Sequence, residues 1–150
     1  MNIYIGSDHG GFILKQHIIQ YLQSQGHTVL DVCCPNGDRC DYPDSASVVC
    51  KKIQQDTQGL GILLCGTGIG ISIAANKYNG IRCALCNEVF SAEMAKKHNN
   101  ANIIALGSRI IDECMAIQIM NIFLTSTFEG GRHQNRLDKI TRIEENRKEH

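Results

Sequence analysis

The sequence predicts an α/β protein with a parallel sheet, on two observations. Short apolar segments of strand character alternate with segments whose apolar residues recur at helical spacing, and the alternation continues through the 150 residues. Such alternation indicates parallel strands joined by right-handed crossovers, which place helices on both faces of a sheet. We therefore expect one domain over residues 1–150, a Rossmann-like three-layer αβα sandwich around five parallel strands.

The amino-terminal third predicts two strands and one helix. Ile3–Ile5 is a short apolar run, which indicates a buried strand. Within Gly10–Gln25 apolar residues recur three or four positions apart, which predicts a helix with one apolar face. Gly26 is a natural helix stop, and the apolar segment Thr28–Val32 predicts the second strand. Cys33–Tyr42 has no periodicity and is expected to be a loop.

The central segments predict two helices and two strands. Pro43 suits the first turn of a helix, and an apolar stripe over residues 46–53 supports that helix. The apolar runs Gly61–Cys65 and Ile81–Cys86 predict strands. Ile69–Tyr78, which lies between them, is compatible with a helix.

The carboxyl-terminal third predicts the helix Val89–His98, the strand Ile103–Leu106 and the helix Ile111–Leu124. The last segment, Gln134–Lys148, is helical in pattern but rich in charge. Its apolar seam comprises only Leu137, Ile140 and Ile143. So narrow a seam suits an arm that lies across a second subunit, and it equally suits an ordinary surface helix.

Composition narrows the possible partners and the compartment. The chain has 15 Lys and Arg against 15 Asp and Glu. This balance argues against binding to nucleic acid or to a membrane surface, which needs a basic field. Met1–Gly6 lacks the basic start and apolar core of a signal peptide, and no apolar run approaches membrane-spanning length. We therefore expect a cytoplasmic protein whose eight cysteines are reduced thiols.

The most informative stretch is Cys65–Gly70, where a strand ends at a cysteine and alternate glycines precede a helix. In a parallel sheet this cysteine stands at the carboxyl end of a strand, where ligands bind. The glycines allow backbone N–H groups to converge on an anion at the helix N-terminus. A thiol beside such groups has its thiolate favoured and can act as a base or nucleophile. The stretch predicts an enzyme for a small anionic substrate.

Several other chemistries are excluded by the same residues. The glycine loop lacks the Lys and Ser or Thr of a Walker A motif. A cysteine phosphatase loop needs an arginine six residues after Cys65, where Ile71 stands. Cys83 and Cys86 have thioredoxin-like spacing but fall within a predicted strand, so we expect structural thiols. No set of histidines and cysteines has zinc-site spacing, and we expect neither a metal nor a cofactor.

Further polar clusters flank the predicted strands and helices, and they are Gly6–Gly11, His98–Asn100, Ser108–Arg109 and Gly130–Arg136. Each has a plainer interpretation. Asp8 suits a helix N-cap, and His98 is a favourable charge at a helix end. Arg132 and Arg136 are four residues apart and suit a solvated face. Their combination with Cys65 favours an active site.

These residues resemble those of the type B ribose-5-phosphate isomerases, relatives of the galactose-6-phosphate isomerase subunits. The resemblance covers nearly the whole chain. The motifs that carry it are Ser7–Phe12, Asp41–Pro43, Cys65–Lys77, Gly80–Arg82, His98–Asn99, Gly107–Arg109 and Glu129–His133. It implies metal-free interconversion of an aldose phosphate and a ketose phosphate through an enediolate.

The resemblance also implies roles for individual residues. Cys65 is the base that moves a proton between C2 and C1, and Thr67 helps move the proton between the sugar oxygens. His98 opens the furanose ring, with Asp8 assisting. The enediolate charge is stabilised by backbone N–H groups of the loop, which comprises Gly66, Thr67, Gly68, Ile69 and Gly70.

Substrate binding and assembly follow from the same resemblance. The phosphate is held by arginines, and guanidinium groups suit phosphate oxygens. The implied binding residues are Arg132 and Arg136, with Arg109 and His9 contributing, Asn99 for a hydroxyl or the oxyanion, and Tyr42 lining the pocket. Family active sites form between subunits, so His98, Asn99 and Arg109 are expected to reach Cys65 of a partner. The chain is thus expected to form a homodimer, or a tetramer of paired dimers.

Three functions remain open from the sequence. The leading one is ribose-5-phosphate isomerase of the pentose phosphate pathway. A second is an isomerase of a six-carbon substrate, such as allose 6-phosphate or galactose 6-phosphate, because the sequence does not report pocket depth. A third is a non-catalytic binding module for a sugar phosphate or nucleotide, which would need neither Cys65 nor His98.

Overall fold

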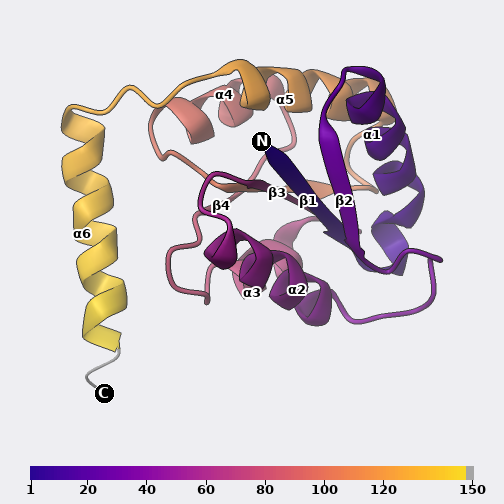
Figure 1. Ribbon diagram of the computed structural model, residues 1–150, viewed down its shortest axis with the longest axis horizontal. Coiled ribbons are helices and arrows are strands. Elements are labelled where there is room, and N and C mark those ends of the chain that lie inside the picture. The colour runs from indigo at the N-terminus through magenta and orange to yellow at the C-terminus, as the bar shows by residue number, and fades with distance from the viewer. Residues whose placement is uncertain (148–150) are drawn as a thin grey trace.

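The computed structural model describes residues 1–147 and contains the expected alternation of strands and helices (Figure 1). Its strands are β1 (Asn2–Ser7), β2 (Thr28–Cys33), β3 (Leu60–Cys65), β4 (Cys83–Leu85) and β5 (Ile103–Gly107). Its helices are the 3-10 turn η1 (His9–Gly11), α1 (Phe12–Ser24), α2 (Tyr42–Gln55), α3 (Ile69–Ala75), α4 (Val89–Lys97), α5 (Glu113–Thr125) and α6 (Arg132–Arg147).

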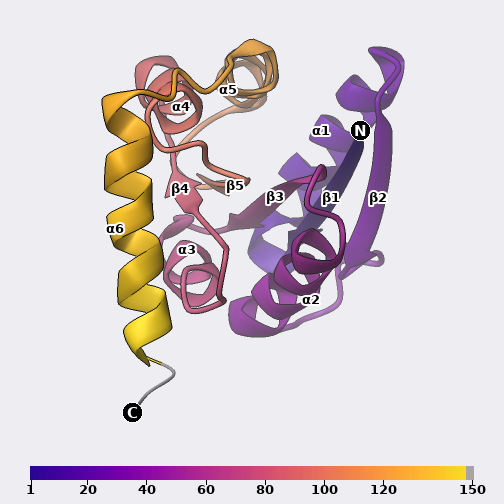
Figure 2. The ribbon, with the colours of Figure 1, turned by 60° about the vertical axis from the view of Figure 1, so that its left-hand side comes forward.

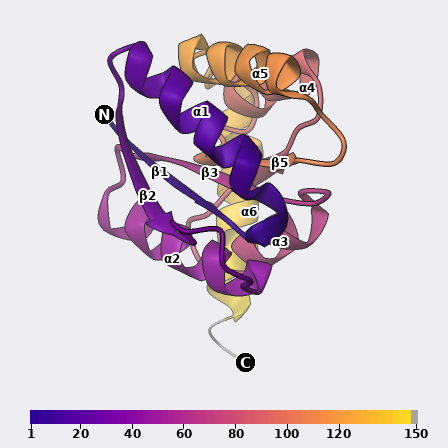
Figure 3. The same cartoon turned by 90° about the vertical axis from the view of Figure 1, so that its right-hand side faces the viewer.

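The five strands form one parallel sheet in the order β2-β1-β3-β5-β4, which confirms the Rossmann-like sandwich. Helices α1, α4 and α5 cover one face, and α2 and α3 cover the other, as Figures 2 and 3 also show. All six residues of β3 are buried, as expected for the central strand of a sheet covered on both faces. Because the strands are parallel and adjacent, the carboxyl ends of β1, β3 and β5 lie side by side on the same side of the sheet.

Several element boundaries differ from the predicted ones for local reasons. Only Cys83–Leu85 of the predicted strand 81–86 pairs with β5, because Ile81 closes a turn by donating its N–H to the Tyr78 carbonyl. Helix α5 begins two residues later than predicted, since the Asp112 carboxylate caps it by accepting the Met115 N–H at 2.8 Å. Lys148, the predicted end of the last helix, lies outside the described residues.

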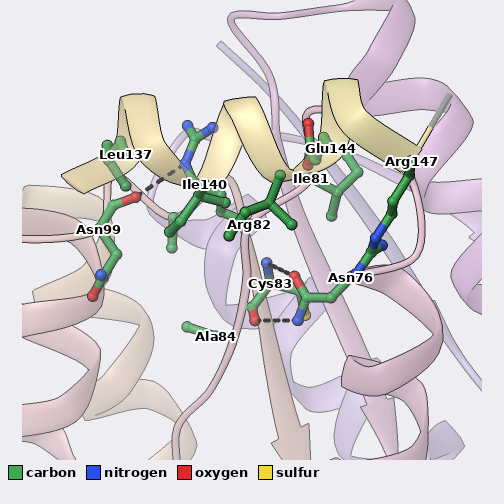
Figure 4. A pocket seen from close by; sticks show the side chains of 12 residues that line it. Asn76, Ile81, Arg82, Cys83, Ala84, Asn99, Leu137, Ile140, Glu144 and Arg147 are labelled. Atoms are coloured by element: carbon green, nitrogen blue, oxygen red, sulfur yellow. Dashed lines mark hydrogen bonds between the residues drawn. The ribbon is translucent and has the colours of Figure 1, made fainter. Parts of the chain in front are cut away.

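Helix α6 stands beside the edge strand β4 and is joined to the rest by an extended link (Figures 1 and 2). Gly130 and Gly131 of that link have positive φ values of 67° and 57°. Along α6 only Leu137 of the apolar seam is buried, while Ile140 and Ile143 are 42% and 58% exposed. All three side chains line a pocket between α6 and β4 (Figure 4). No helix within residues 1–147 is long and apolar enough to cross a membrane.

Candidate active site

The thiol of Cys65 lies at the carboxyl end of β3 and is only 4% exposed. Its sulfur accepts a hydrogen bond from the backbone N–H of Gly68 at 3.1 Å. Gly68 has a φ of 77°, and a Cβ atom there would lie 2.5 Å from Leu85 Cδ1 and 2.9 Å from the Leu106 carbonyl carbon. Only glycine therefore allows this loop to present an N–H group to the sulfur.

Ser108 links the carboxyl ends of the three central strands, β1, β3 and β5, through hydrogen bonds. Its hydroxyl donates to the Gly10 carbonyl at 2.7 Å and lies 3.1 Å from the Cys65 carbonyl oxygen. Its backbone N–H also donates to that Cys65 oxygen, at 2.9 Å. Sequence reasoning noted Ser108 as part of a cluster without giving it a role, because the contact joins residues almost a hundred positions apart.

Asp8 and His9 lie at the same ends of the strands, after β1. One Asp8 oxygen, Oδ1, accepts the Gly11 N–H at 3.1 Å, so the plain N-cap interpretation is correct. Its second oxygen has no hydrogen bond to residues 1–147 and is available to a ligand. His9 is exposed, and its Nδ1 lies 3.2 Å from the carbonyl oxygen of Cys40 in the loop between β2 and α2.

Tyr42 and Arg109 border the glycine loop from two sides. A Cβ atom at Gly70 would lie 2.6 Å from Tyr42 Cζ, so the tyrosine ring rests directly on this glycine. A Cβ atom at Gly66 would lie 3.2 Å from Arg109 Nη1. Arg109 was expected to reach the loop of a partner subunit, but the structure places it against the loop of its own chain. The reason is local, because the Arg109 N–H donates to the Gly66 carbonyl at 2.9 Å.

The remaining predicted residues lie at the other ends of the strands, on the side of the sheet where β5 begins. His98 and Asn99 follow α4 and precede β5, whereas Cys65 pairs with Gly107 at the far end of β5. The five residues of β5 separate these two levels by roughly 16 Å. The described chain thus brings together Asp8, His9, Tyr42, Cys65–Gly70 and Arg109, and separates from them His98, Asn99, Arg132 and Arg136.

His98 is stacked on His133, which the sequence analysis included in two motifs without giving it a role. The rings of His98 and His133 are parallel to within 12°, with centroids 4.1 Å apart. Burial lowers the pKa of His133, and the charges of His98 and Arg132 lower it further. The first turns of α6, which carry Arg132 and Arg136, are therefore held next to His98. No spacing signal joins residues so distant in the sequence.

The other cysteines fit the expected structural role. Burial raises the pKa of the Cys86 thiol to about 12 and also raises the pKa of Cys83, so both remain protonated. Burial likewise raises the pKa of Cys50 to about 12. All eight cysteines are free thiols. A disulfide-based or thioredoxin-like chemistry is therefore unsupported.

A parallel α/β fold with a buried thiol and a glycine loop at the carboxyl end of its central strand is typical of an enzyme with its site at the strand ends. The model of the Ribose/Galactose Isomerase family matches residues 3–140. The chain is 45% identical over 145 residues to ribose-5-phosphate isomerase B of Escherichia coli strain K12, with 97% of each chain covered. It is also 45% identical over 141 residues to D-erythrulose-4-phosphate isomerase of Pectobacterium atrosepticum, with 93% of each covered.

A solved structure supports the same relationship. Ribose-5-phosphate isomerase B of Mycoplasma genitalium, determined with bound ribulose 5-phosphate, superimposes with a TM-score of 0.93 at 43% identity and covers 96% of both chains. The chain belongs to the Ribose/Galactose Isomerase family. It is therefore an isomerase, and the alternative of a non-catalytic binding module is not supported.

Proposed function

We propose that this chain interconverts ribose 5-phosphate and ribulose 5-phosphate in the pentose phosphate pathway, without a metal. The observation that carries the proposal is the buried Cys65 thiol with the Gly68 N–H on its sulfur at 3.1 Å. A backbone N–H places positive charge beside the sulfur, which is what a thiolate base requires. The names of the relatives from Escherichia coli and Mycoplasma genitalium support the choice of a five-carbon substrate.

The loop geometry supports the following proton transfers. Cys65 takes the proton from C2 of the open-chain sugar and returns it to C1, with an enediolate between the two steps. N–H groups of the loop, held at the start of α3, stabilise the negative charge of the enediolate. The Thr67 hydroxyl oxygen accepts the Ile69 N–H at 3.2 Å, which leaves its own O–H free to exchange a proton with a sugar oxygen.

Ring opening and phosphate binding require groups from the other ends of the strands. We assign ring opening to His98 and phosphate binding to Arg132 and Arg136, in keeping with the family resemblance. Because these groups lie far from Cys65 in one chain, a second copy supplies them, and the active unit is a homodimer. In each site the first chain contributes Asp8, His9, Tyr42, Cys65, the glycine loop and Arg109, and the second contributes the histidine, Asn99 and the two arginines.

The direct test is isomerisation of ribose 5-phosphate by purified protein in the presence of EDTA. We expect activity in the wild type and a loss of at least about a hundredfold in Cys65→Ala. Cys114→Ala is a matched control, since Cys114 is exposed on α5. A folded wild type without activity would contradict the proposed substrate. A fully active Cys65→Ala would contradict the assignment of Cys65 as the base.

Substrate length needs its own comparison. The relatives named for a four-carbon and for a five-carbon substrate are each 45% identical to this chain, so identity does not choose between them. The six-carbon phosphates considered from the sequence form a third arm. Rates for erythrulose 4-phosphate, ribose 5-phosphate and allose 6-phosphate, measured side by side, test the assignment. A large preference for the four- or six-carbon sugar would overturn it.

A further inference from the structure

We propose that His98, Glu129 and His133 form a binding site for a transition-metal dication, Zn²⁺ in particular, that inhibits the enzyme and does not take part in catalysis. One ligand atom from each residue lies within 4.8 Å of the other two. The three residues come from different segments, namely the end of α4, the link before α6 and the first turn of α6. Glu129 and His133 are four residues apart in the sequence, and the fold brings His98 to them.

His133 provides a second and independent observation. Its side chain is only 5% exposed, yet its Nε2 atom has no hydrogen-bond partner among residues 1–147. The nearest carboxylate oxygen, Glu129 Oε2, is 3.9 Å away, which is too far for a hydrogen bond. A buried nitrogen without a partner is costly, and a metal ion between Nε2 and Glu129 would satisfy both groups.

The charges around the cluster set its expected affinity. A metal ion binds the neutral form of histidine, and the unpartnered Nε2 atom of His133 is the donor that the structure offers. Arg132 and Arg136 are close enough to affect the same ring, and their positive charges oppose a dication. The Glu129 carboxylate offsets part of that repulsion. We therefore expect moderate affinity.

The donor types select the metal. Two imidazoles and one carboxylate match the three-ligand sets of zinc sites and suit Mg²⁺ or Ca²⁺ poorly. Because the two rings are stacked nearly parallel, we expect the His98 ring to turn when both histidines bind one ion. That ring is half-buried and makes no hydrogen bond to residues 1–147, which leaves it free to do so. A fourth coordination position stays open to water.

The inhibitory part of this inference rests on the proposed function, which assigns ring opening to His98. A dication that holds His98 prevents it from exchanging a proton with the furanose. Cyclic ribose 5-phosphate should then be affected more strongly than open-chain ribulose 5-phosphate. The binding part does not rest on any activity and is tested without substrate.

The binding test is a titration of the metal-free full chain with Co²⁺, followed by visible absorption and calorimetry. We expect one Co²⁺ per chain, visible bands without the near-ultraviolet bands of thiolate ligands, and displacement by Zn²⁺. Glu129→Gln and His133→Asn should each weaken binding by about tenfold or more. His17→Asn is the matched control, since His17 pairs with Glu113 at 2.9 Å without a second histidine and should leave binding unchanged.

Three results would overturn the site: absence of saturable binding, thiolate bands in the cobalt spectrum, or unchanged affinity in Glu129→Gln. The activity test adds Zn²⁺ to the wild type and to Glu129→Gln. Inhibition of the wild type, strongest with ribose 5-phosphate, and resistance of Glu129→Gln support the inhibitory role. Failure of metal binding leaves activity in EDTA untouched, so the two proposals fail separately.

Discussion

Cys65 and His98 lie at opposite ends of the strands of one parallel sheet, Cys65 as the last residue of β3 and His98 before the start of β5. A sugar phosphate is too short to contact both residues of one chain across a five-residue strand. If both residues act on one substrate molecule, they must come from different subunits. This relationship leads to the first prediction.

Mixing two inactive variants should restore activity. Cys65→Ala retains a functional His98, and His98→Asn retains a functional Cys65, so a heterodimer of the two contains one intact site. Random exchange at equal concentrations should restore about a quarter of the wild-type activity, since half the dimers are mixed and each has one intact site of two. Activity is measured after the mixture is dissociated and reassociated. A mixture no more active than its components would indicate that each site lies within one chain.

His98→Asn should separate ring opening from proton transfer. We expect turnover of cyclic ribose 5-phosphate to fall by a hundredfold or more, in the range of general acid–base catalysis, and turnover of ribulose 5-phosphate to fall far less. Ribulose 5-phosphate has no furanose ring to open, and this accounts for the difference. Initial rates in both directions provide the measurement. Equal losses in the two directions would contradict the ring-opening role.

Gly68→Ala should damage both stability and activity. A positive φ alone costs an L-residue about 1–2 kcal/mol, and the new Cβ would also collide with backbone atoms of β5. Gly26→Ala is the control, because Gly26 has a φ of 86° but no atom within 4 Å of the added Cβ. Urea unfolding should show the larger loss for Gly68→Ala, and only that variant should lose turnover. Equal unfolding free energies for Gly68→Ala and Gly26→Ala would mean that the loop can shift to accommodate the added Cβ atom.

Lys15→Met should destabilise the chain strongly although the two side chains are similar in size. Lys15 is fully buried on α1, and its ammonium donates to Asp31 at 2.9 Å and to the carbonyls of Cys33 and Cys34 at 2.8 and 2.9 Å. Breaking a buried pair by removing one partner costs about 3–5 kcal/mol. Lys51→Met, on the exposed side of α2, is the control. Similar denaturation midpoints for the two variants would contradict this account.

The hydrogen bond between Tyr4 and Asp56 should make stability depend on pH at both extremes. The Tyr4 hydroxyl donates to Asp56 Oδ2 at 2.8 Å, which lowers the carboxyl pKa below its ordinary 3.8 and, by the same bond, raises the tyrosine pKa above 10.0. A lowered carboxyl pKa stabilises the fold above pH 3.8 and stops doing so as pH falls through the folded value. A raised tyrosine pKa stabilises it below pH 10.0 and stops doing so as pH rises through the folded value.

Tyr4→Phe should therefore differ most from the wild type between about pH 4 and 10, and the difference should shrink at both ends. Melting temperatures across pH provide the measurement. Tyr21→Phe is the control, because the Tyr21 hydroxyl donates to the neutral amide oxygen of Asn121 at 2.9 Å. A Tyr4→Phe difference that stays constant in acid would contradict the linkage.

The fold was largely predictable because its signals are local. Strand and helix periodicity identified every strand and helix other than η1, and glycine and proline placed several ends correctly. The misplaced boundaries depend on contacts that periodicity does not contain, such as the Ile81 turn that shortens β4. The burial of Lys15 likewise could not be predicted from the sequence, since a lysine on an amphipathic helix normally faces solvent.

The site was predictable in its list of residues and less so in their arrangement. Cys65 and the glycine loop follow from strand-end reasoning alone. Arg109 was expected in a partner's site and instead contacts its own Gly66 loop, a placement fixed by a backbone hydrogen bond. His133 belonged to two of the motifs, but its stack on His98 had no signal in the sequence, because the contact depends on how the link folds α6 back towards α4.

The link at Gly130 and Gly131 has a consequence for the evolution of substrate choice. In the proposed dimer, the base belongs to one subunit and the phosphate-binding arginines of α6 belong to the other. The length of the sugar that fits between the base and the arginines then depends on how the two subunits are arranged. It is set by the offset of one subunit relative to its partner and by the angle at which α6 leaves the link. Such an enzyme can acquire a longer or shorter substrate without a single change beside the thiol.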